Sequence, residues 1–364
     1  MVETTRDAVA LLRHLRRIDG AGAASPDPAV VALLARLQTR PDAWLNWLEH
    51  QELAGYCGAL LADTGLDEAL LPAARERLTH ARRRQSRRNR RLLELLRALK
   101  AGLEEAGVPF LLIKGFVVSV RFAGGLDRRL MWDQDVIVRP RDLGAVMAAG
   151  ETLGLRARAG AGLDPARLTR VLHAIELLDA KRKLDIHWVF RNRRGMRLGY
   201  DDLAPAAQPL ELGGTPVQAI SDLDLLVVSA LSLLNDMERS SVRLRKVWDV
   251  YLMVTQLDAD TDWAGWLQRP DVRPLRRPLL NVIAFALALV ADGDDCLRLR
   301  ARLAEHRHLL RIAEPETARR IARRPRQSLV NRWLMSRVQP VPAAQWWAWW
   351  LGTLPVRVWH GRKL

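Results

Sequence analysis

Acidic residues in the middle of the 364-residue sequence are spaced in a way that suits metal binding. Asp133 and Asp135 are separated by one residue at the start of a short apolar segment typical of a β-strand. Because side chains alternate along a strand, both carboxylates should lie on one face, roughly 7 Å apart. Two carboxylates held in this way can bind a pair of divalent cations. Mg²⁺ is the expected cation, with Mn²⁺ as an alternative, because it is a hard ion that prefers carboxylate and phosphate oxygens.

Three further features strengthen this interpretation over the alternative that both acids are solvated residues at a strand end. Lys114 and Gly115 directly follow a short apolar segment, and there a glycine lets the backbone approach phosphate while a cation neutralises it. Arg129 lies four residues before Asp133. Asp185 lies on a later strand with an apolar residue on each side. An acid in such a strand is costly unless it is paired or metal-bound.

The elements that must position these residues form a mixed arrangement. Apolar spacing and prolines predict helices over residues 1–107, a small α/β unit over 108–220 and further helices over 221–364. The fold class is therefore α+β. Within the central unit the patterns predict four strands and two helices; the strands are expected at 108–113, 135–138, 174–178 and 184–188, and the helices at 116–122 and 142–153.

Four stretches resemble the uncharacterised bacterial nucleotidyltransferase family of the DNA polymerase β-like superfamily. They are FLLIKGFVVSVRF, RLMWDQDVIV, KLDIHW and, more loosely, RLRKVWDVYLM, and with the preceding helix they cover about residues 85–255. The family pattern is a strand ending in Lys-Gly, a helix, an Arg before an Asp-x-Asp strand, and an acid-x-His-Trp strand. The resemblance implies a minimal nucleotidyltransferase mixed sheet flanked by helical segments from both ends of the chain.

The resemblance also implies an activity, which is the metal-dependent transfer of a nucleoside monophosphate from a nucleoside triphosphate with release of pyrophosphate. Asp133 and Asp135 would hold two Mg²⁺ ions, and Asp185 would share one of them and help to remove the proton of the acceptor. The acceptor would be an unknown hydroxyl or phosphate. By analogy with the family, a natural-product peptide, a saccharide or RNA could supply it.

The same resemblance assigns phosphate contacts. Lys114 and Gly115 would lie near the phosphates, together with Arg129, and a later helix would add Arg243 and Lys246. Its other arginine, Arg245, would contribute in the same way.

The sequence departs from the family pattern at two positions beside the acids, and its later helix lacks the histidines that the family often carries. Gln134 replaces an apolar residue, which suits a strand face that is partly wet, and Trp132 replaces a small one. The indole could narrow the site or stack on a base. His187 could be a metal ligand or a base, although a structural hydrogen bond is favoured. Asp249 is expected to pair with an arginine on its own helix.

The charge balance predicts polyanionic partners. Lysine and arginine number 57 against 41 aspartates and glutamates, so the formal net charge is +16. Such a field attracts nucleic acid, nucleotides or an acidic membrane surface. The densest basic run, 82–91, could be a nucleic-acid patch, but the leucine-rich helix that follows favours a solvated helix face. No aromatic residue interleaves with these arginines. An alternative function is a non-catalytic RNA- or membrane-binding protein on a degenerate transferase scaffold.

Other function classes find little support in the sequence. Two cysteines, Cys57 and Cys296, exclude a disulfide scaffold and a four-cysteine zinc site. The first residues do not resemble a secretory signal, and no apolar run reaches 18 residues, so we expect a cytoplasmic protein. The tryptophan-rich segment 345–351 could contact a membrane, but packing against the N-terminal helices is favoured.

Overall fold

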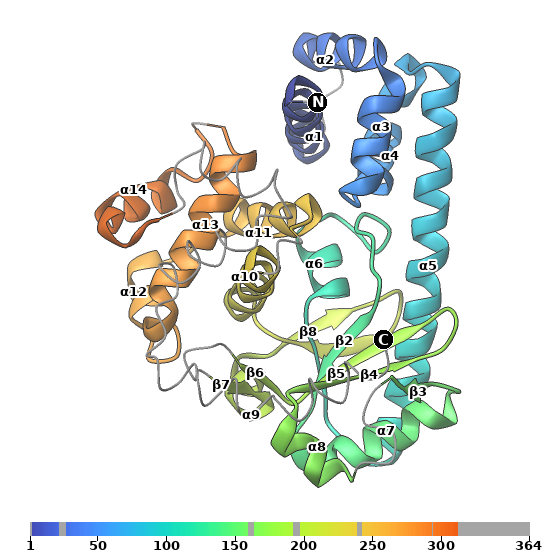
Figure 1. Ribbon diagram of the computed structural model, residues 1–364, viewed down its shortest axis with the longest axis vertical. Helices are drawn as coiled ribbons and strands as arrows, with labels where there is room; N and C mark the ends of the chain where they lie inside the picture. The colour runs from blue at the N-terminus through green and yellow to red at the C-terminus, as the bar shows by residue number, and fades with distance from the viewer. Residues whose placement is uncertain are drawn as a thin grey trace.

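The computed structural model describes residues 2–21, 27–158, 164–191, 197–238, 242–292 and 294–311. N-terminal helices lie at the top of Figure 1, a β-sheet lies below them, and the later helices lie to the left. The expectations for the tryptophan-rich segment 345–351 concern residues outside the described ones.

The N-terminal region is helical, as predicted, over its described residues. Three of its helices begin at a proline, which suits the first helical turn because the missing N–H has no partner there anyway. The helices are α1 (Val2–Ala21), α2 (Pro28–Gln38), α3 (Pro41–His50), α4 (Ala54–Asp63) and α5 (Pro72–Glu105). A short 3₁₀ helix, Leu66–Ala69, connects the last two.

Helix α5 connects the upper helices to the sheet. Its 34 residues span about 51 Å at 1.5 Å per residue. It packs against α4 near its start and continues down beside the sheet, where it contacts α7 (Leu143–Thr152) (Figure 1). Buried side chains recur at intervals of three and four residues on one side of the helix from Ala74 to Leu103, so it packs against other elements along its whole length.

The sheet has seven strands in the order β3-β4-β5-β2-β1-β9-β8. Two neighbouring pairs, β2 with β5 and β1 with β9, are parallel and the others are antiparallel, so the sheet is mixed. The strands are β1 (Leu111–Leu112), β2 (Gln134–Ile137), β3 (Arg156–Ala157), β4 (Ala174–Leu178), β5 (Lys183–His187), β8 (Gln208–Glu211) and β9 (Pro216–Ala219). A separate hairpin pairs β6 (Val189–Arg191) with β7 (Arg197–Gly199). The predicted α+β class is confirmed.

Sequence patterning found the central strands and missed the outer ones. The four predicted strands correspond to β1, β2, β4 and β5, and the two predicted helices correspond to α6 (Gly115–Arg121) and α7. Strands β3, β8 and β9 were not predicted. They have two to four residues each, and most of their side chains are at least partly exposed, so they lack the apolar run of a buried strand.

Helices from the C-terminal half pack beside the sheet and against the N-terminal bundle. The longest of them, α10, α11 and α13, contact one another (Figure 1). The remaining helices are α8 (Pro165–Val171), α9 (Tyr200–Leu203), α10 (Asp222–Glu238), α11 (Leu244–Leu257), α12 (Trp263–Gln268), α13 (Arg276–Val290) and α14 (Leu297–Glu305). One hydrophobic core runs through all three regions, and the boundaries at 108 and 221 stay a prediction.

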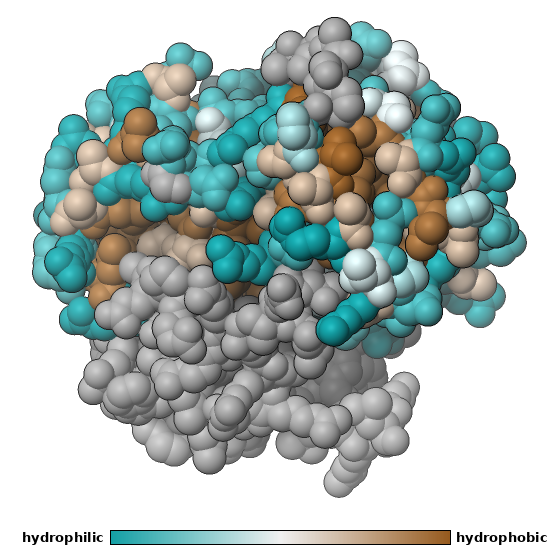
Figure 2. All heavy atoms as spheres, turned by 90° about the horizontal axis from the view of Figure 1, so that it is seen from above, coloured by the Kyte–Doolittle hydropathy of each residue, from teal (hydrophilic) through white to brown (hydrophobic). Residues whose placement is uncertain are grey.

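The surface seen from above mixes hydrophilic and apolar residues wherever it is coloured (Figure 2). Among the described residues, no helix is both long and apolar enough to cross a bilayer. Large apolar side chains that are well exposed include Trp132, which is 46% exposed and directly precedes Asp133.

Candidate active site

Strand pairing brings two of the predicted acids together. Strands β2 and β5 run parallel with Asp135 opposite Asp185 and Ile137 opposite His187. Partners in register point to the same face of a sheet, and residues two apart on one strand share a face. The carboxylates of Asp135 and Asp185 and the ring of His187 therefore gather on one side of the sheet.

These three side chains form a group that fits a metal ion. One potential ligand atom from each of Asp135, Asp185 and His187 lies within 4.8 Å of the others. Asp185 Oδ1 and His187 Nδ1 are buried and have no hydrogen-bond partner among the described residues. Buried polar atoms are normally paired, so an atom without a partner at such a place calls for an explanation. Two carboxylates and a neutral imidazole are suitable ligands for a divalent cation.

The charges of the group act on one another. Burial raises the pKa of Asp185, and the nearby carboxylates of Asp135 and Asp133 raise it further. Burial would also raise the pKa of Asp135, but Lys114 and His187 outweigh it and hold that pKa well below its usual range. Burial and the charge of Lys114 lower the pKa of His187 and favour the neutral ring.

His187 makes the structural contact that the sequence favoured, and its role as a ligand or base stays a prediction. Its Nε2 lies 3.2 Å from Asp135 Oδ1, which is the structural hydrogen bond favoured from the sequence. Its ring also stacks on Phe190, with 4.9 Å between the ring centroids. The same ring is close enough to both carboxylates to act as a ligand.

Lys183 holds the third acid beside this group. Its Nζ lies 3.3 Å from Asp133 Oδ2, 3.2 Å from Asp185 Oδ2 and 2.9 Å from Glu176 Oε1. Asp133 precedes β2 and is not one of the three residues whose ligand atoms lie within 4.8 Å. We refer to Asp133, Asp135, Glu176 and Asp185 as the carboxylate cluster.

Lys183 and Glu176 are functional candidates that the sequence motifs do not indicate. Alternation along β5 places Lys183 on the same face as Asp185, and the antiparallel register with β4 places Glu176 opposite Asp185. The signal available in the sequence was the Lys-x-Asp-x-His alternation, which puts one cation, one acid and one imidazole on a single face.

Lys114 approaches the cluster from a strained turn. Its Nζ lies 3.1 Å from Asp135 Oδ1, and its φ of 56° is unusual for a residue with a side chain. Gly115 follows with a φ of 26°, and a Cβ added there would point toward the Asp133 carbonyl oxygen, 3.9 Å away. The Lys-Gly turn thus lies against the backbone that carries the first acid, and such strain is often retained at functional sites.

Arg129 lies near the cluster but faces α11. Its guanidinium donates two hydrogen bonds to the Asp249 carboxylate, at 2.9 and 2.8 Å. Arg245, on the same helix as Asp249, is 3.7 Å from that carboxylate and 2.8 Å from Glu52. Asp249 therefore has the expected arginine on its own helix, and Arg129 is its closer partner.

The other two predicted phosphate contacts lie on and beside α11. Arg243 Nη1 is 2.7 Å from His50 Nε2. Lys246 Nζ is 2.7 Å from Asp236 Oδ2. Neither is in contact with the carboxylate cluster in the described structure, and their role in binding phosphate stays a prediction.

Buried polar side chains of α5 hold the loop that leads to Asp133. Asn89 Nδ2 donates to the carbonyl oxygens of Leu126 and Arg129, at 2.8 Å each, and its Oδ1 accepts from the backbone N–H of Met131. Gln85 donates to the Asp127 carbonyl oxygen. These bonds fix the loop to the helix, so α5 positions the start of β2.

Gln134 and Trp132, the two residues beside the acids that depart from the family pattern, lie in very different surroundings. Gln134 points away from the acids and is 1% exposed, so its face of the strand is dry rather than partly wet. Its Nε2 donates to the Asp135 carbonyl oxygen, whereas its buried Oε1 has no partner among the described residues. Trp132 is exposed and lies under the guanidinium of Arg88, 3.9 Å from the ring centroid.

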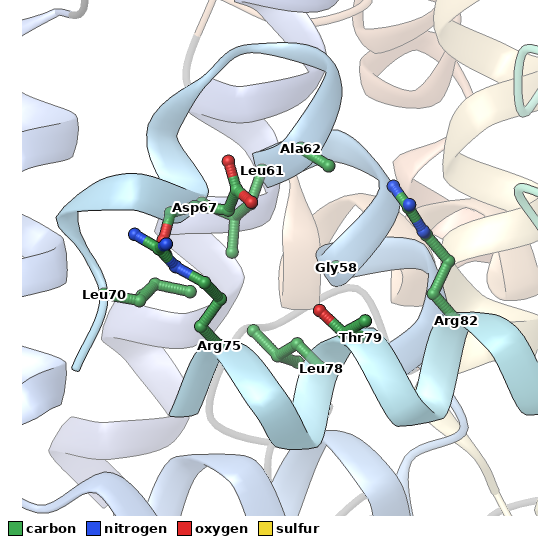
Figure 3. A pocket seen from close by; sticks show the side chains of 9 residues that line it. All are labelled: Gly58, Leu61, Ala62, Asp67, Leu70, Arg75, Leu78, Thr79 and Arg82. Carbon is green, nitrogen blue, oxygen red and sulfur yellow. The ribbon is translucent and has the colours of Figure 1, made fainter. Parts of the chain in front are cut away.

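A small pocket elsewhere contains none of these residues. It lies between α4, the following 3₁₀ helix and α5, and Figure 3 shows Arg75 and Arg82 at its two sides. Arg75 Nε donates a hydrogen bond to the Asp67 carbonyl oxygen, so one of the two arginines of the pocket already has a partner within the protein. The carboxylate cluster is therefore the stronger candidate for chemistry.

Comparison with known proteins identifies the family. The profile of a family described as uncharacterised nucleotidyltransferase matches residues 38–291, which is more than half of the chain. The chain belongs to this family. The match includes the carboxylate cluster, the Lys-Gly turn and α11. The protein is therefore an enzyme of the nucleotidyltransferase class.

Two solved structures are similar to this nucleotidyltransferase at 15% identity. One is the solution structure of the antibiotic-resistance factor ANT(2'')-Ia. The aligned region covers 60% of this chain and 98% of that chain, with a TM-score of 0.37. The other is the crystal structure of ANT(2'')-Ia in complex with adenylyl-2''-tobramycin, covering 51% and 95%, with a TM-score of 0.33. These scores are too low to support an argument about substrate. Among curated protein sequences, none matches significantly.

Proposed function

We propose that this nucleotidyltransferase moves a nucleoside monophosphate from a nucleoside triphosphate to a hydroxyl or phosphate acceptor, in a reaction that depends on a divalent cation. The observation that carries the proposal is the pairing of Asp135 with Asp185 across parallel strands, next to a buried Asp185 oxygen that has no partner. The resemblance to the family supports the same assignment.

The carboxylate cluster would hold the cation. Asp135 and Asp185 are the central ligands, with His187 within reach and Asp133 beside them. A bound divalent cation would polarise the α-phosphate and lower the pKa of an acceptor hydroxyl. Mg²⁺ fits this oxygen-rich set, and Mn²⁺ also tolerates an imidazole ligand.

Asp185 is suited to take the acceptor proton. Its buried Oδ1 has no hydrogen-bond partner among the described residues, so this oxygen is placed to accept a proton. The acceptor oxygen would form a bond to the α-phosphorus while the bond to the pyrophosphate oxygen breaks. The proton would move to Asp185, and pyrophosphate would leave with the electron pair of the broken bond.

Cations around the cluster would bind the triphosphate. Lys114 contacts Asp135, and the Gly115 backbone lies beside that of Asp133. Arg129 interacts electrostatically with both acids. We propose Lys114 and Gly115 as phosphate-binding residues, whereas the guanidinium of Arg129 is bound by Asp249 and would act on the phosphates through its charge alone. Arg243 and Lys246 would contribute only if a bound triphosphate reaches α11. Phosphoryl transfer depends mainly on such positioning and charge neutralisation.

The test is transfer of label from each α-labelled nucleoside triphosphate to acceptors in a cell extract, with Mg²⁺ and with EDTA. We expect Mg²⁺-dependent label and pyrophosphate release from the wild type. Asp133→Asn and Asp135→Asn should abolish both. Asp260→Asn is the matched control because it makes the same chemical change at an exposed position outside the cluster. Equal labelling by the cluster variants and the control would refute the site.

A further inference from the structure

Helix α5 carries a row of arginines that the proposed reaction does not use. Arg84, Arg87, Arg88 and Arg91 follow one another at intervals of three, one and three residues, so they lie on one side of the helix. Arg84, Arg87 and Arg91 are exposed and make no ion pair with an acid in the part of the chain that the structure describes. We call these four residues the arginine stripe.

The arginine stripe meets an aromatic side chain that lies next to the active site. The Arg88 guanidinium lies over the Trp132 ring, 3.9 Å from its centroid, and the indole remains 46% exposed. Asp133 follows Trp132 directly in the chain, and its charge acts on Arg88. The aromatic residue that is missing from the basic run in the sequence is thus supplied by the fold.

The stripe and the acids are held in one rigid arrangement. Gln85 and Asn89 alternate with the stripe along α5 and bond the loop that leads into Trp132 and Asp133. Both side chains are buried. A molecule bound along the stripe therefore has a fixed position relative to the carboxylate cluster.

We propose that the arginine stripe and Trp132 bind the single-stranded end of a nucleic acid, whose terminal nucleotide is the acceptor. The acceptor role rests on the proposed nucleotidyl transfer. Guanidinium groups would pair with successive phosphates, and a terminal base would stack on the exposed indole. The hydroxyl oxygen of the terminal nucleotide would form a bond to the α-phosphorus while the bond to pyrophosphate breaks. The hydroxyl proton would pass to Asp185.

A lipid surface fits these residues less well. Insertion into a membrane interface requires apolar side chains gathered around the indole. The guanidinium of Arg88 covers the indole and Asp133 follows it in the chain, while the apolar neighbour Met131 is buried and offers no surface for insertion. A stacked base beside a phosphate uses both the ring and the guanidinium.

The binding test uses labelled single-stranded RNA and DNA of the same sequence, about 12 nucleotides long, with EDTA and without nucleoside triphosphate. Anisotropy is measured at several salt concentrations. We expect the triple variant Arg84→Ala, Arg87→Ala, Arg91→Ala to lower the slope of log affinity against log salt by about 2, because each lost phosphate contact removes about 0.7. Trp132→Ala should weaken binding about tenfold at every salt concentration, with the slope unchanged.

The matched control removes the same charge elsewhere. Arg6 on α1 and Arg167 and Arg170 on α8 are exposed, and their triple alanine variant should bind as the wild type does. Equal losses in the two triple variants would overturn the proposal, because the net charge of the whole chain would then explain binding. Stripe-dependent binding to phosphatidylserine vesicles, without binding to either strand, would overturn it as well. Comparing the affinities for the RNA strand and the DNA strand shows which of the two nucleic acids the protein prefers.

The acceptor role is tested by adding Mg²⁺ and α-labelled triphosphate to the bound strand. We expect label on a strand with a free terminal hydroxyl and none on a strand whose terminus is blocked. A bound but unlabelled strand, with label on another molecule of a cell extract, would overturn the acceptor role while the proposed transfer stands. Failure to label anything in the extract would instead refute the transfer itself.

Discussion

Two groups of charged side chains near the start of β2 are built in opposite ways. Arg129 and Asp249 form a bidentate pair in which both carboxylate oxygens accept a hydrogen bond, and Arg245 adds a second cation. In the carboxylate cluster four acids contact three basic side chains, which are Lys114, Lys183 and Arg158, and one buried Asp185 oxygen has no partner among the described residues. The first group is complete without a ligand, whereas the second is not.

This difference separates a structural role from a chemical one. A paired buried charge stabilises its surroundings only while both partners remain, and removing one leaves the other uncompensated. An incompletely paired acidic group costs stability by itself and gains it when a cation arrives. Substitutions in the two groups should therefore have opposite effects on activity and on folding.

The largest effect is expected on activity, from Asp185→Asn. Loss of a ligand and proton acceptor should lower the rate of pyrophosphate release about 10³-fold or more. Stability should stay the same or rise, because the substitution relieves repulsion from Asp135 and Asp133. Kinetics and a thermal melt without metal check both parts, and a lower melting temperature would contradict the second.

The next largest effect is on folding, from Asp249→Ala. This change leaves Arg129 buried without its bidentate partner, and we expect a loss of about 3 kcal/mol in the free energy of unfolding. Urea denaturation measures it. A loss below about 1 kcal/mol would show that water or another acid can replace Asp249. It would then be wrong that Arg129 depends on this one partner.

An intermediate effect is expected from Lys183→Met. Without this ammonium, Asp133 and Asp185 lose the cation they share and Glu176 keeps Arg158 alone, so the metal-free protein should melt at a lower temperature than the wild type. Mn²⁺ should then raise the melting temperature more in the variant than in the wild type, because it relieves more repulsion. Equal shifts in the two proteins would mean that Lys183 does not balance the cluster.

The smallest effect is expected from Gln134→Leu. Gln134 has a buried Oε1 without a partner but points to the opposite face of β2 from the acids. Replacing it with an apolar side chain of similar size should be neutral or should stabilise the fold by up to about 1 kcal/mol, with activity retained. Loss of activity in a folded Gln134→Leu protein would show that incomplete pairing on that face also matters.

The sequence predicted the central part of this fold because its signals are local. Short apolar segments marked the strands that carry Asp135 and Asp185. Alternation predicted one face for Asp133 and Asp135, but β2 begins after Asp133. Parallel pairing of β2 with β5, and hence the contact between Asp135 and Asp185, could only be inferred from the family resemblance. The contact of Lys183 with Asp133 depends on the pairing of β2 with β5, and its contact with Glu176 on the register with β4, to which the sequence gives no direct clue.

Contacts between distant segments explain what was missed. Arg129 lies 120 residues from Asp249, and the local expectation found only the arginine on the same helix. Arg88 and Trp132 meet because α5 and the loop before β2 pack together, so a basic run without aromatic residues still acquires one. The edge strands β3, β8 and β9 escaped because short, half-exposed strands lack a strong apolar pattern.

The most direct test of the proposed site is Mn²⁺ binding followed by electron paramagnetic resonance, without nucleotide. We predict saturable binding to the wild type and to Asp260→Asn, and at least tenfold weaker binding to Asp135→Asn and Asp185→Asn. Unchanged Mn²⁺ affinity in a folded Asp185→Asn protein would contradict the claim that the paired strands β2 and β5 present a cation site.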